Sequence, residues 1–438
     1  MKKTFTLKST KCKCLKGIIH VPPDKSISIR ALLVSSICFG NSKIKNLLIS
    51  DDVINTLESL KKLGIKVKKK NNFIEVYGNG GYFENPKSSL DLGNSGTGVR
   101  LLCGLLCNRG VKARLVGDKS LSSRSMMRIV DPLSKMNAVL KHKNGFLPLE
   151  IQNNHDSSIP IKYNLKFGSA QIKSAILLAG LNLKGTTTVK ENIPSRDHTE
   201  IMLKHFGANI SKKKNIIKLQ SPNLLKGNDV VIPGDFSSAA FIIVATLITK
   251  NSNSTIKDVG LNFFRTGLID VLKKMQANIT LKNKRYQNGE LVGDIVVKSS
   301  NLFSITVNKT ISPRLIDEYP ILFVAASYAK GKSKFYGLDE LKLKESDRLK
   351  SMSQALKDAG VEILEKNNSL EILGKKQNKG GNQVQTNLDH RIAMSMLVFG
   401  MASKEPVKID DMKMIKTSFP NFKKIFNNLG AKIELVQK

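Results

Sequence analysis

One short phrase recurs six times along this chain, each time at the end of a helical pattern. It consists of an apolar residue, a glycine or a substitute for it, an alanine, isoleucine or valine, any residue, and a second apolar residue. Such a phrase predicts a helix that ends at a C-cap and is followed by a strand. The copies lie roughly seventy residues apart, which is too long a period for the usual solenoids. They begin at Leu63, Met136, Phe206, Met275, Ala359 and Leu429.

Two turn-forming stretches divide the six copies into equal groups. Val21–Asp24 contains two consecutive prolines, and Val230–Asp235 contains Pro-Gly between the third and the fourth copy. A chain of 438 residues is long enough for two domains, each with its own core. We therefore expect an α/β protein with two similar lobes of three α/β units each, and a hinge and a cleft between them. Residues 22–235 would form one lobe, and residues 1–21 plus 236–438 the other.

The net charge is strongly positive, and the kind of basic residue decides what this means. Lys and Arg number 71 against 35 Asp and Glu, a formal net charge of +36, but only 12 of the basic residues are Arg. We interpret the scattered lysines mainly as a solvated surface. The rare Arg residues are candidates for binding carboxylate or phosphate, because a guanidinium forms paired hydrogen bonds that an ammonium cannot. A nucleic-acid-binding protein would place aromatic residues among the basic ones, whereas this chain has no Trp and 6% aromatic residues.

The five cysteines include no Cys-x-x-Cys pair, which argues against a zinc site or a disulfide framework. Cys103 and Cys107 lie four residues apart in an apolar helical pattern, as core residues do. Residues 1–17 are too polar for a signal peptide, and apolar runs such as 239–249 are too short to span a membrane. We expect a soluble cytoplasmic protein.

The stretch Gly93–Arg100 is the first candidate for an anion site. It contains three glycines and precedes an apolar helical run, so its backbone can approach a ligand and the new helix presents free N–H groups. Its glycine spacing fits neither the dinucleotide-binding fingerprint nor a P-loop. Taken alone, such a glycine-rich turn before a helix is more often a plain connection.

Four further runs in the first half bring cations, hydroxyls and amides to the starts of expected helices. At such positions cationic and hydroxyl donors can meet a phosphate, and small polar side chains can hold a sugar-like polyol. Each run alone is also explained by a helix cap, as for Ser169, or by surface charge. The runs are Asp24–Arg30, Gly117–Arg128, Gly168–Ser174 and Ser195–Glu200.

The second half adds carboxylates to runs that contain Arg. Asp317 stands at the mouth of an apolar helix, either as its N-cap or as a base. Glu345 and Arg348 have the i, i+3 spacing that puts both on one helix face, where an exposed ion pair is the alternative to a functional role. Asp389–Arg391 begins another expected helix, and Lys416–Pro420 begins the last one.

More than half of the rare Arg residues lie in these runs, so the expected ligand carries several phosphate or carboxylate groups. The sequence offers neither a His/Cys cluster for a metal nor a Ser-His-Asp arrangement, which disfavours metal-assisted and acyl-enzyme chemistry. The carboxylates able to handle protons are Asp317, Glu345 and Asp389. The Arg residues are Arg30, Arg100, Arg124, Arg128, Arg196, Arg348 and Arg391.

Taken together, these runs resemble the enolpyruvylshikimate-phosphate synthase family of the shikimate pathway, which leads to chorismate and the aromatic amino acids. The family's fold is an inside-out α/β arrangement of two lobes with three units each, which agrees with the six-copy repeat. The resemblance implies transfer of the enolpyruvyl group of phosphoenolpyruvate to the 5-hydroxyl of shikimate 3-phosphate through a tetrahedral intermediate, with release of phosphate and without a cofactor or metal. The runs are Asp24–Ser26 with Arg30, Gly93–Gly98 with Arg100, Ser169–Gln171, Ser195–Glu200, Lys344–Arg348 and Asp389–Arg391.

The resemblance also implies a role for each matching residue. Asp317 would take the proton of the 5-hydroxyl, Glu345 would protonate the methylene carbon, and Lys25 would take part in the loss of phosphate. Shikimate 3-phosphate would be bound by Lys25, Ser26, Arg30, Ser169, Ala170, Gln171, Arg196, Asp317 and Lys344. Phosphoenolpyruvate would be bound by Lys25, Gly96, Arg124, Gln171, Arg348, Arg391 and Lys416. Asn94, Thr97, Arg100 and His390 would line the same site.

The chain follows one branch of this family and departs from the other. Ala170 stands where the other branch has a second Ser, and Arg196 appears where that branch uses a nearby tyrosine. Gly96 leaves room beside the phosphate of phosphoenolpyruvate, so we expect sensitivity to glyphosate, the family's inhibitor competitive with that substrate.

The nearest alternative is the sibling enzyme that transfers enolpyruvate to UDP-N-acetylglucosamine and uses a reactive cysteine in a mobile loop. We expect none of the five cysteines to occupy such a loop. The expected partners are the two small-molecule substrates, with neither nucleic acid nor membrane, and the expected state is a monomer.

Overall fold

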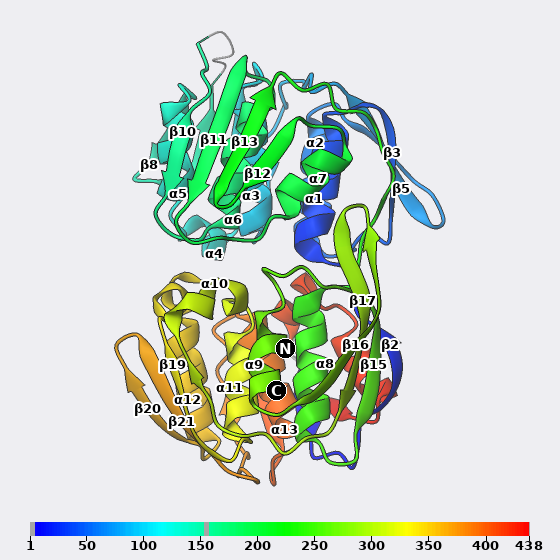
Figure 1. Ribbon diagram of the computed structural model, residues 1–438, viewed down its shortest axis with the longest axis vertical. Coiled ribbons are helices and arrows are strands. Elements are labelled where there is room, and N and C mark those ends of the chain that lie inside the picture. Colours follow the sequence, from blue (N-terminus) through cyan, green and yellow to red (C-terminus); the bar gives the residue numbers. More distant parts are fainter. Residues whose placement is uncertain (1–4, 153–156, 438) are drawn as a thin grey trace. The chain divides into compact units, whose positions relative to one another are not determined.

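The computed structural model describes residues 5–152 and 157–437, and the chain forms two compact units (Figure 1). Both units are discontinuous in sequence. A short segment that the expected division assigned to the second lobe, Tyr286–Glu290, groups with the unit made mostly of the first half. Unit 1 consists of Met1–Pro22, Pro233–Arg285 and Leu291–Lys438, and unit 2 consists of Pro23–Ile232 and Tyr286–Glu290.

The strands of the described residues form six four-stranded sheets, three in each unit. In every sheet an edge strand runs parallel to its neighbour, which then pairs antiparallel with the third strand. The predicted α/β fold with three repeats in each half is thereby confirmed.

The strand order in unit 2 is β14(Val230–Val231)-β3(Phe39–Lys45)-β5(Phe73–Asn79)-β4(Lys66–Lys69), β6(Leu90–Asp91)-β7(Ala113–Val116)-β9(Phe146–Ile151)-β8(Leu140–Lys143) and β10(Lys162–Leu165)-β11(Gly185–Glu191)-β13(Ile216–Ser221)-β12(Ile210–Lys213). In unit 1 it is β2(Lys16–His20)-β15(Asn253–Gly260)-β17(Glu290–Lys298)-β16(Asn278–Gln287), β18(Thr306–Val307)-β19(Gly331–Tyr336)-β21(Ser369–Gly374)-β20(Glu362–Lys366) and β22(Gln383–Val384)-β23(Val407–Ile409)-β1(Phe5–Thr10)-β24(Lys432–Gln437).

All six copies of the repeated phrase end a helix in the same way, as predicted. The second residue of each copy has a positive φ, from 62° at Asn137 to 104° at Gly430. In the first copy the N–H of Ile65 donates to Leu60 at 3.0 Å and that of Gly64 to Lys61 at 3.0 Å, the pair of bonds of a Schellman cap. Each cap leads from a helix into a strand: α2(Asp51–Lys62) into β4, α5(Met127–Lys135) into β8, α7(His198–His205) into β12, α9(Gly267–Lys274) into β16, α12(Arg348–Asp358) into β20 and α14(Phe422–Asn428) into β24.

Three further helices form the centre of each unit. In unit 2 they are α1(Lys25–Ser36), α3(Gly96–Leu106) and α6(Ala170–Gly180), and α3 packs against both of the others. In unit 1 they are α8(Phe236–Ile248), α11(Tyr319–Ser327) and α13(His390–Gly400), which pack against one another. Helices that are apolar all round, such as α8, belong in a core.

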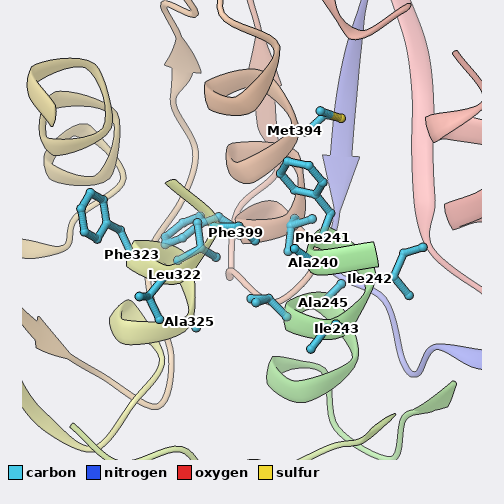
Figure 2. Packing of buried hydrophobic residues seen from close by; sticks show 14 of the residues in the cluster. Ala240, Phe241, Ile242, Ile243, Ala245, Leu322, Phe323, Ala325, Met394 and Phe399 are labelled. Atoms are coloured by element: carbon cyan, nitrogen blue, oxygen red, sulfur yellow. The ribbon is translucent and has the colours of Figure 1, made fainter. Parts of the chain in front are cut away.

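The core of unit 1 shows this packing directly. Figure 2 shows Phe241 of α8, Leu322 of α11 and Phe399 of α13 among the buried side chains between these helices. Tyr319 stacks on Phe323 within α11 with ring centroids 5.6 Å apart. No helix in the described part of the chain is long and apolar enough to cross a membrane.

Each central helix begins at a capping residue that belongs to, or adjoins, a run singled out in the sequence. The side chains of Asp24 and Ser169 accept backbone N–H groups from the first turn of α1 and α6. Because these helices occupy the middle of each unit, the runs at their N-termini are held by the core. The remaining short helices are α4(Lys119–Ser122), α10(Ser312–Leu315), η1(Lys309–Ile311), η2(Asp339–Leu343) and η3(Lys413–Thr417).

Candidate active site

The N-termini of the three central helices of unit 1 meet through polar contacts. Ser237, in the first turn of α8, donates its hydroxyl to Glu318, the N-cap of α11, at 2.5 Å. Arg391, in the first turn of α13, reaches the same Ser237 oxygen at 3.2 Å and Glu318 Oε1 at 3.5 Å. The starts of the three helices therefore form one polar cluster.

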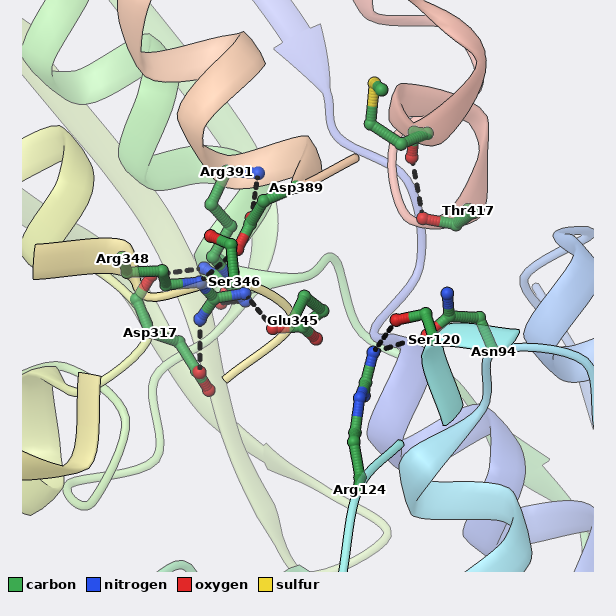
Figure 3. A network of polar contacts seen from close by, with 12 residues as sticks. Asn94, Ser120, Arg124, Asp317, Glu345, Ser346, Arg348, Asp389, Arg391 and Thr417 are labelled. Carbon is green, nitrogen blue, oxygen red and sulfur yellow. Dashed lines mark hydrogen bonds and ion pairs between the residues drawn. The ribbon is translucent and has the colours of Figure 1, made fainter. Parts of the chain in front are cut away.

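Arg348 is the centre of this cluster and is 1% exposed. Its Nε donates to Asp389 Oδ2 at 2.8 Å, its Nη1 to Asp317 Oδ1 at 3.4 Å, and its Nη2 to Glu345 (Figure 3). Burial would lower the pKa of Arg348, but Asp389, Glu345 and Asp317 outweigh it and raise that pKa. The guanidinium is therefore permanently charged and holds three carboxylates in fixed positions.

The carboxylates around Arg348 differ in access to solvent. The Asp389 side chain is fully buried, caps α13 through the N–H of Arg391 at 2.9 Å, and accepts the Ser346 hydroxyl at 3.1 Å. The side chains of Asp317 and Glu345 are 18% and 26% exposed. Only the latter two are thus placed to exchange a proton with a ligand, whereas Asp389 serves the helix and the guanidinium.

Two expectations about these carboxylates are wrong in detail. Asp317 is not the N-cap of α11, because Glu318 occupies that position and Asp317 precedes it. Glu345 lies before α12 rather than on a helix face with Arg348, and their ion pair is not the exposed pair of the simpler interpretation, because Arg348 is buried.

Sequence reasoning missed Arg265, which is 5% exposed and lies on the other side of Asp317. Its Nη2 donates to Asp235 Oδ1 at 2.9 Å and to Ser237 Oγ at 2.8 Å, and its Nη1 lies 3.8 Å from Asp317 Oδ2. The two oxygens of Asp317 therefore face two different guanidiniums. The scarcity of Arg was the available signal, but Arg265 lies just before α9 and outside the runs that were chosen.

In unit 2 the starts of α3 and α6 meet at Gln171. Its side-chain carbonyl accepts from Arg100 Nη1 at 2.8 Å, and its amide nitrogen donates to Thr97 Oγ1 at 3.1 Å. Gly96, one residue before Thr97, is buried, and a Cβ built on it would lie 3.0 Å from Arg100 Nη1 and 3.3 Å from Arg124 Nη1. The first turn of α3 is therefore lined by two guanidiniums.

Arg124 approaches this turn from the loop that follows the short helix α4. Its Nη2 donates to Asn94 Oδ1 at 2.5 Å and to Ser120 Oγ at 3.1 Å (Figure 3). These partners are neutral, in contrast to the carboxylates around Arg348. These hydrogen bonds hold the guanidinium beside the first turn of α3.

At the start of α1, Lys25 Nζ donates to Asp52 Oδ2 at 2.8 Å. Asp52, which sequence reasoning missed, is 4% exposed and lies in the first turn of α2. Arg30 is also buried, and burial lowers its pKa to about 10, an effect that the carboxylate of Asp24 opposes. Arg30 donates to Thr199 Oγ1 at 2.7 Å and to Ser174 Oγ at 3.1 Å.

The remaining candidates are distributed over both units. Those in unit 2 are half-buried: Ser26, Ser169, Ala170 and Arg196. In unit 1, Lys344 is half-buried before α12, His390 is 6% exposed as the first residue of α13, and Lys416 is exposed in η3 rather than at the start of α14.

The described residues contain no group of three or more His, Cys, Asp or Glu that could hold a metal ion. Four of the cysteines are buried, and burial raises the pKa of Cys38 and of Cys107 to about 12. Such thiols are poor nucleophiles at neutral pH.

Comparisons of sequence and of structure with known proteins all match this chain to the same family. The family model described as EPSP synthase (3-phosphoshikimate 1-carboxyvinyltransferase) matches residues 9–426. The chain is 46% identical to the 3-phosphoshikimate 1-carboxyvinyltransferase of Bartonella henselae over 442 residues, which covers 99% of this chain and 100% of the relative. It is 44% identical to the protein of that name from Zymomonas mobilis, covering 98% and 97%. The solved structure of EPSP synthase from Acinetobacter baumannii matches with a TM-score of 0.89 at 36% identity, over 99% of this chain and 100% of that one.

Proposed function

This chain belongs to the EPSP synthase (3-phosphoshikimate 1-carboxyvinyltransferase) family, and on that premise we propose how its residues perform the reaction. It is a transferase of the shikimate pathway, on the route to the aromatic amino acids. It transfers the enolpyruvyl group of phosphoenolpyruvate to shikimate 3-phosphate. The 5-hydroxyl is the proposed acceptor, and inorganic phosphate is the second product.

The proposed site for shikimate 3-phosphate lies mainly at the starts of α1 and α6. Helix N-termini favour anions, and these two present an ammonium, hydroxyls and an amide in their first turns. Arg196 would add a guanidinium from the loop before α7, and Lys344 and Asp317 would come from unit 1. The proposed ligands are Lys25, Ser26, Arg30, Ser169, Ala170, Gln171, Arg196, Asp317 and Lys344.

Phosphoenolpyruvate would be held at both of its charged ends. Its phosphate would meet Lys25, Gly96, Arg124, Gln171 and Lys416, and the buried Gly96 supports this because its missing side chain leaves the backbone accessible to a ligand. Asn94, Thr97, Arg100 and His390 would complete the lining.

The carboxylate of phosphoenolpyruvate would be held by Arg348 and Arg391. Because Arg348 already contacts Asp389, Asp317 and Glu345, an arriving carboxylate has to take the place of one of them. We propose that it replaces Glu345 at Nη2, which leaves Glu345 beside the methylene carbon that it would protonate. The exposed position of Glu345, compared with the fully buried Asp389, supports this exchange.

The chemistry then needs one base and one acid. Asp317 takes the proton of the 5-hydroxyl as the hydroxyl oxygen bonds to the central carbon of the enol, while Glu345, entering the step protonated, gives its proton to the methylene carbon. The resulting tetrahedral adduct loses phosphate as Glu345, now ionised, takes a proton back from the methyl carbon, which restores the double bond. Fixed cations such as Lys25 stabilise the charge that develops on the leaving phosphate.

The observation that carries this proposal is the placement of Asp317 and Glu345, the two partly exposed carboxylates, on opposite nitrogens of the buried Arg348. The test is release of inorganic phosphate by the purified protein with shikimate 3-phosphate plus phosphoenolpyruvate, in the presence of a chelator. We expect turnover that is lost when either substrate is omitted. Release with UDP-N-acetylglucosamine, and none with shikimate 3-phosphate, would favour the sibling enzyme instead.

We further propose that residues 22–235 act as the lobe with most shikimate-phosphate contacts, that 1–21 plus 236–438 act as the second lobe, and that the lobes close on the substrates. The protein would work as a cytoplasmic monomer without a cofactor and without nucleic-acid or membrane partners. Size-exclusion chromatography with light scattering measures whether the protein is a monomer. Retention on DNA that vanishes at moderate salt would indicate only the behaviour of a polycation.

A further inference from the structure

Unit 2 contains a fully buried ammonium that the mechanism above does not use. Lys173 lies in the first turns of α6, just after Gln171, and its side chain is 0% exposed. Its Nζ lies 2.7 Å from Glu200 Oε1 and 3.1 Å from Glu191 Oε1. Removing a charge from water costs several kcal/mol, so a buried ammonium is retained only where strong contacts offset that cost.

The same ammonium fixes the backbone of Ser195. Lys173 Nζ donates to the Ser195 carbonyl at 3.3 Å, while the Ser195 N–H donates to Glu191 Oε1 at 3.0 Å. The Ser195 hydroxyl also donates to Glu191. Every polar group of Ser195 is therefore bound to the Lys173–Glu191 pair, immediately before the half-buried Arg196.

A second layer lies one residue further along α6 and one residue earlier in α7 than the pair Lys173–Glu200. The Ser174 and Thr199 hydroxyls are 2.6 Å apart, and Arg30 of α1 donates to both. Successive residues of α6 thus contact successive residues of α7, and α1 joins them. The three elements tied together each carry or adjoin residues proposed to bind shikimate 3-phosphate.

We propose that Lys173 is a positioning residue for the shikimate 3-phosphate site, fixing the loop between β11 and α7 so that Arg196 is presented to the substrate. This inference rests on the proposed function. It extends that function by naming a side chain that acts through another and does not touch the substrate. Burial raises the pKa of Glu200, which Lys173 opposes, so the charge of the cluster depends on this ammonium.

The test variant is Lys173→Met combined with Glu200→Gln, which removes one positive and one negative group together. We expect KM for shikimate 3-phosphate to rise about tenfold, with KM for phosphoenolpyruvate changed less than about twofold. The matched control is Arg109→Met, another cation of unit 2, whose guanidinium donates to the backbone carbonyls of Leu105 and Gly81. It should lower Tm without changing the ratio of the two KM values.

A double-mutant cycle with Arg196→Ala separates positioning from a general structural role. If Lys173 acts through Arg196, the Lys173 change adds less than about twofold to KM for shikimate 3-phosphate once Arg196 is absent. Additive effects on that KM, or equal rises for both substrates, would overturn the proposal.

Should the double variant fail to fold, Ser195→Ala decides, because it removes one hydroxyl and leaves every charge in place. It should raise KM for shikimate 3-phosphate about two- to threefold, and an unchanged value would count against the proposal. Calorimetric binding of shikimate 3-phosphate alone keeps the two claims apart. If the wild-type protein binds shikimate 3-phosphate but releases no phosphate, the proposed function is contradicted and the positioning role of Lys173 is not.

Discussion

The starts of the central helices are built alike in the two units but carry different chemistry. In unit 2 the N-caps of α1, α3 and α6 are one Asp and two Ser. Arg100 and Arg124 beside them contact neutral side chains, whereas Lys25 contacts the carboxylate of Asp52. In unit 1 all three N-caps are acidic, and every guanidinium near them contacts carboxylates.

This difference shows that one repeated scaffold can serve two purposes. A helix start with cations beside it attracts an anion, which suits the binding of phosphate. Carboxylates held on a guanidinium are kept in fixed positions, which suits the transfer of protons to and from a bound substrate. The proposed division of labour, binding in unit 2 and acid–base chemistry in unit 1, follows from what each unit places at the same positions.

The largest expected effect comes from the proton-transfer groups of unit 1. Asp317→Asn and Glu345→Gln keep the shape of each side chain and remove its ability to exchange a proton. We expect kcat to fall by about 10²- to 10⁴-fold in each variant, measured as phosphate release. Arg285→Gln, which alters an exposed ion pair with Asp258, is the control and should retain activity. A variant of Asp317 with near-normal kcat would remove it from the role of base.

The same substitution in each unit tests the contrast in partners. Arg348→Met removes the buried guanidinium that contacts the fully buried Asp389 and two further carboxylates, so we expect a loss of about 3–5 kcal/mol in the free energy of unfolding. Arg124→Met removes hydrogen bonds to the neutral side chains of Asn94 and Ser120 and should cost less than about 1 kcal/mol, while raising KM for phosphoenolpyruvate. Urea unfolding followed by circular dichroism measures both, and equal losses would contradict the comparison.

A smaller effect is expected from Gly96→Ala. The new Cβ would lie 3.0 Å from Arg100 Nη1 and 3.3 Å from Arg124 Nη1, so the ends of two flexible side chains must shift by a few tenths of an ångström. We expect a several-fold rise in KM for phosphoenolpyruvate with little change in Tm, and weaker inhibition by glyphosate than in the wild type. An unaltered KM would show that the phosphate does not approach Gly96.

The smallest effect concerns pH. Burial raises the pKa of Glu200 above its ordinary value of 4.5, although Lys173 opposes the change. Because the folded protein holds the Glu200 proton more tightly than the unfolded chain does, the protonated side chain stabilises the fold. This contribution to the free energy of unfolding is fully present below the ordinary pKa and is lost as pH rises through the pKa of the folded state. The Glu200→Gln variant should therefore have the same Tm as the wild type at about pH 4 and a higher Tm than the wild type at neutral pH. Arg348 in unit 1, with its raised pKa, gives no such dependence between these pH values.

The repeat and its consequences could be predicted from sequence because they are local. The six caps were found from short patterns, including Gln276 in place of glycine, and all six have the expected positive φ. The rarity of Arg also directed attention to Arg348 and Arg391, which the structure places in one cluster with Asp317.

What sequence reasoning missed depends on contacts between distant parts of the chain. Lys173 looked like one of many solvated lysines, but Glu191 and Glu200 surround it after folding. Arg265 meets Asp235 across 30 residues and Asp317 across 52, and no local pattern marks such pairs. The alternative of an exposed ion pair between Glu345 and Arg348 likewise fails because Arg348 is buried, and the sequence could not show this since exposure is decided by the packing of α12.

The six helix caps share one backbone conformation, so a comparison of their sequences identifies a substitution that should stabilise the protein. Four copies use glycine at the left-handed position, while Asn137 and Gln276 hold it at φ 62° and 67°. A long side chain in this conformation is strained by about 1 kcal/mol, and the other copies supply the residue that relieves it. Gln276→Gly would give the fourth copy the glycine that four other copies have at this position. We expect this variant to have a higher Tm without any change in the proposed substrate contacts.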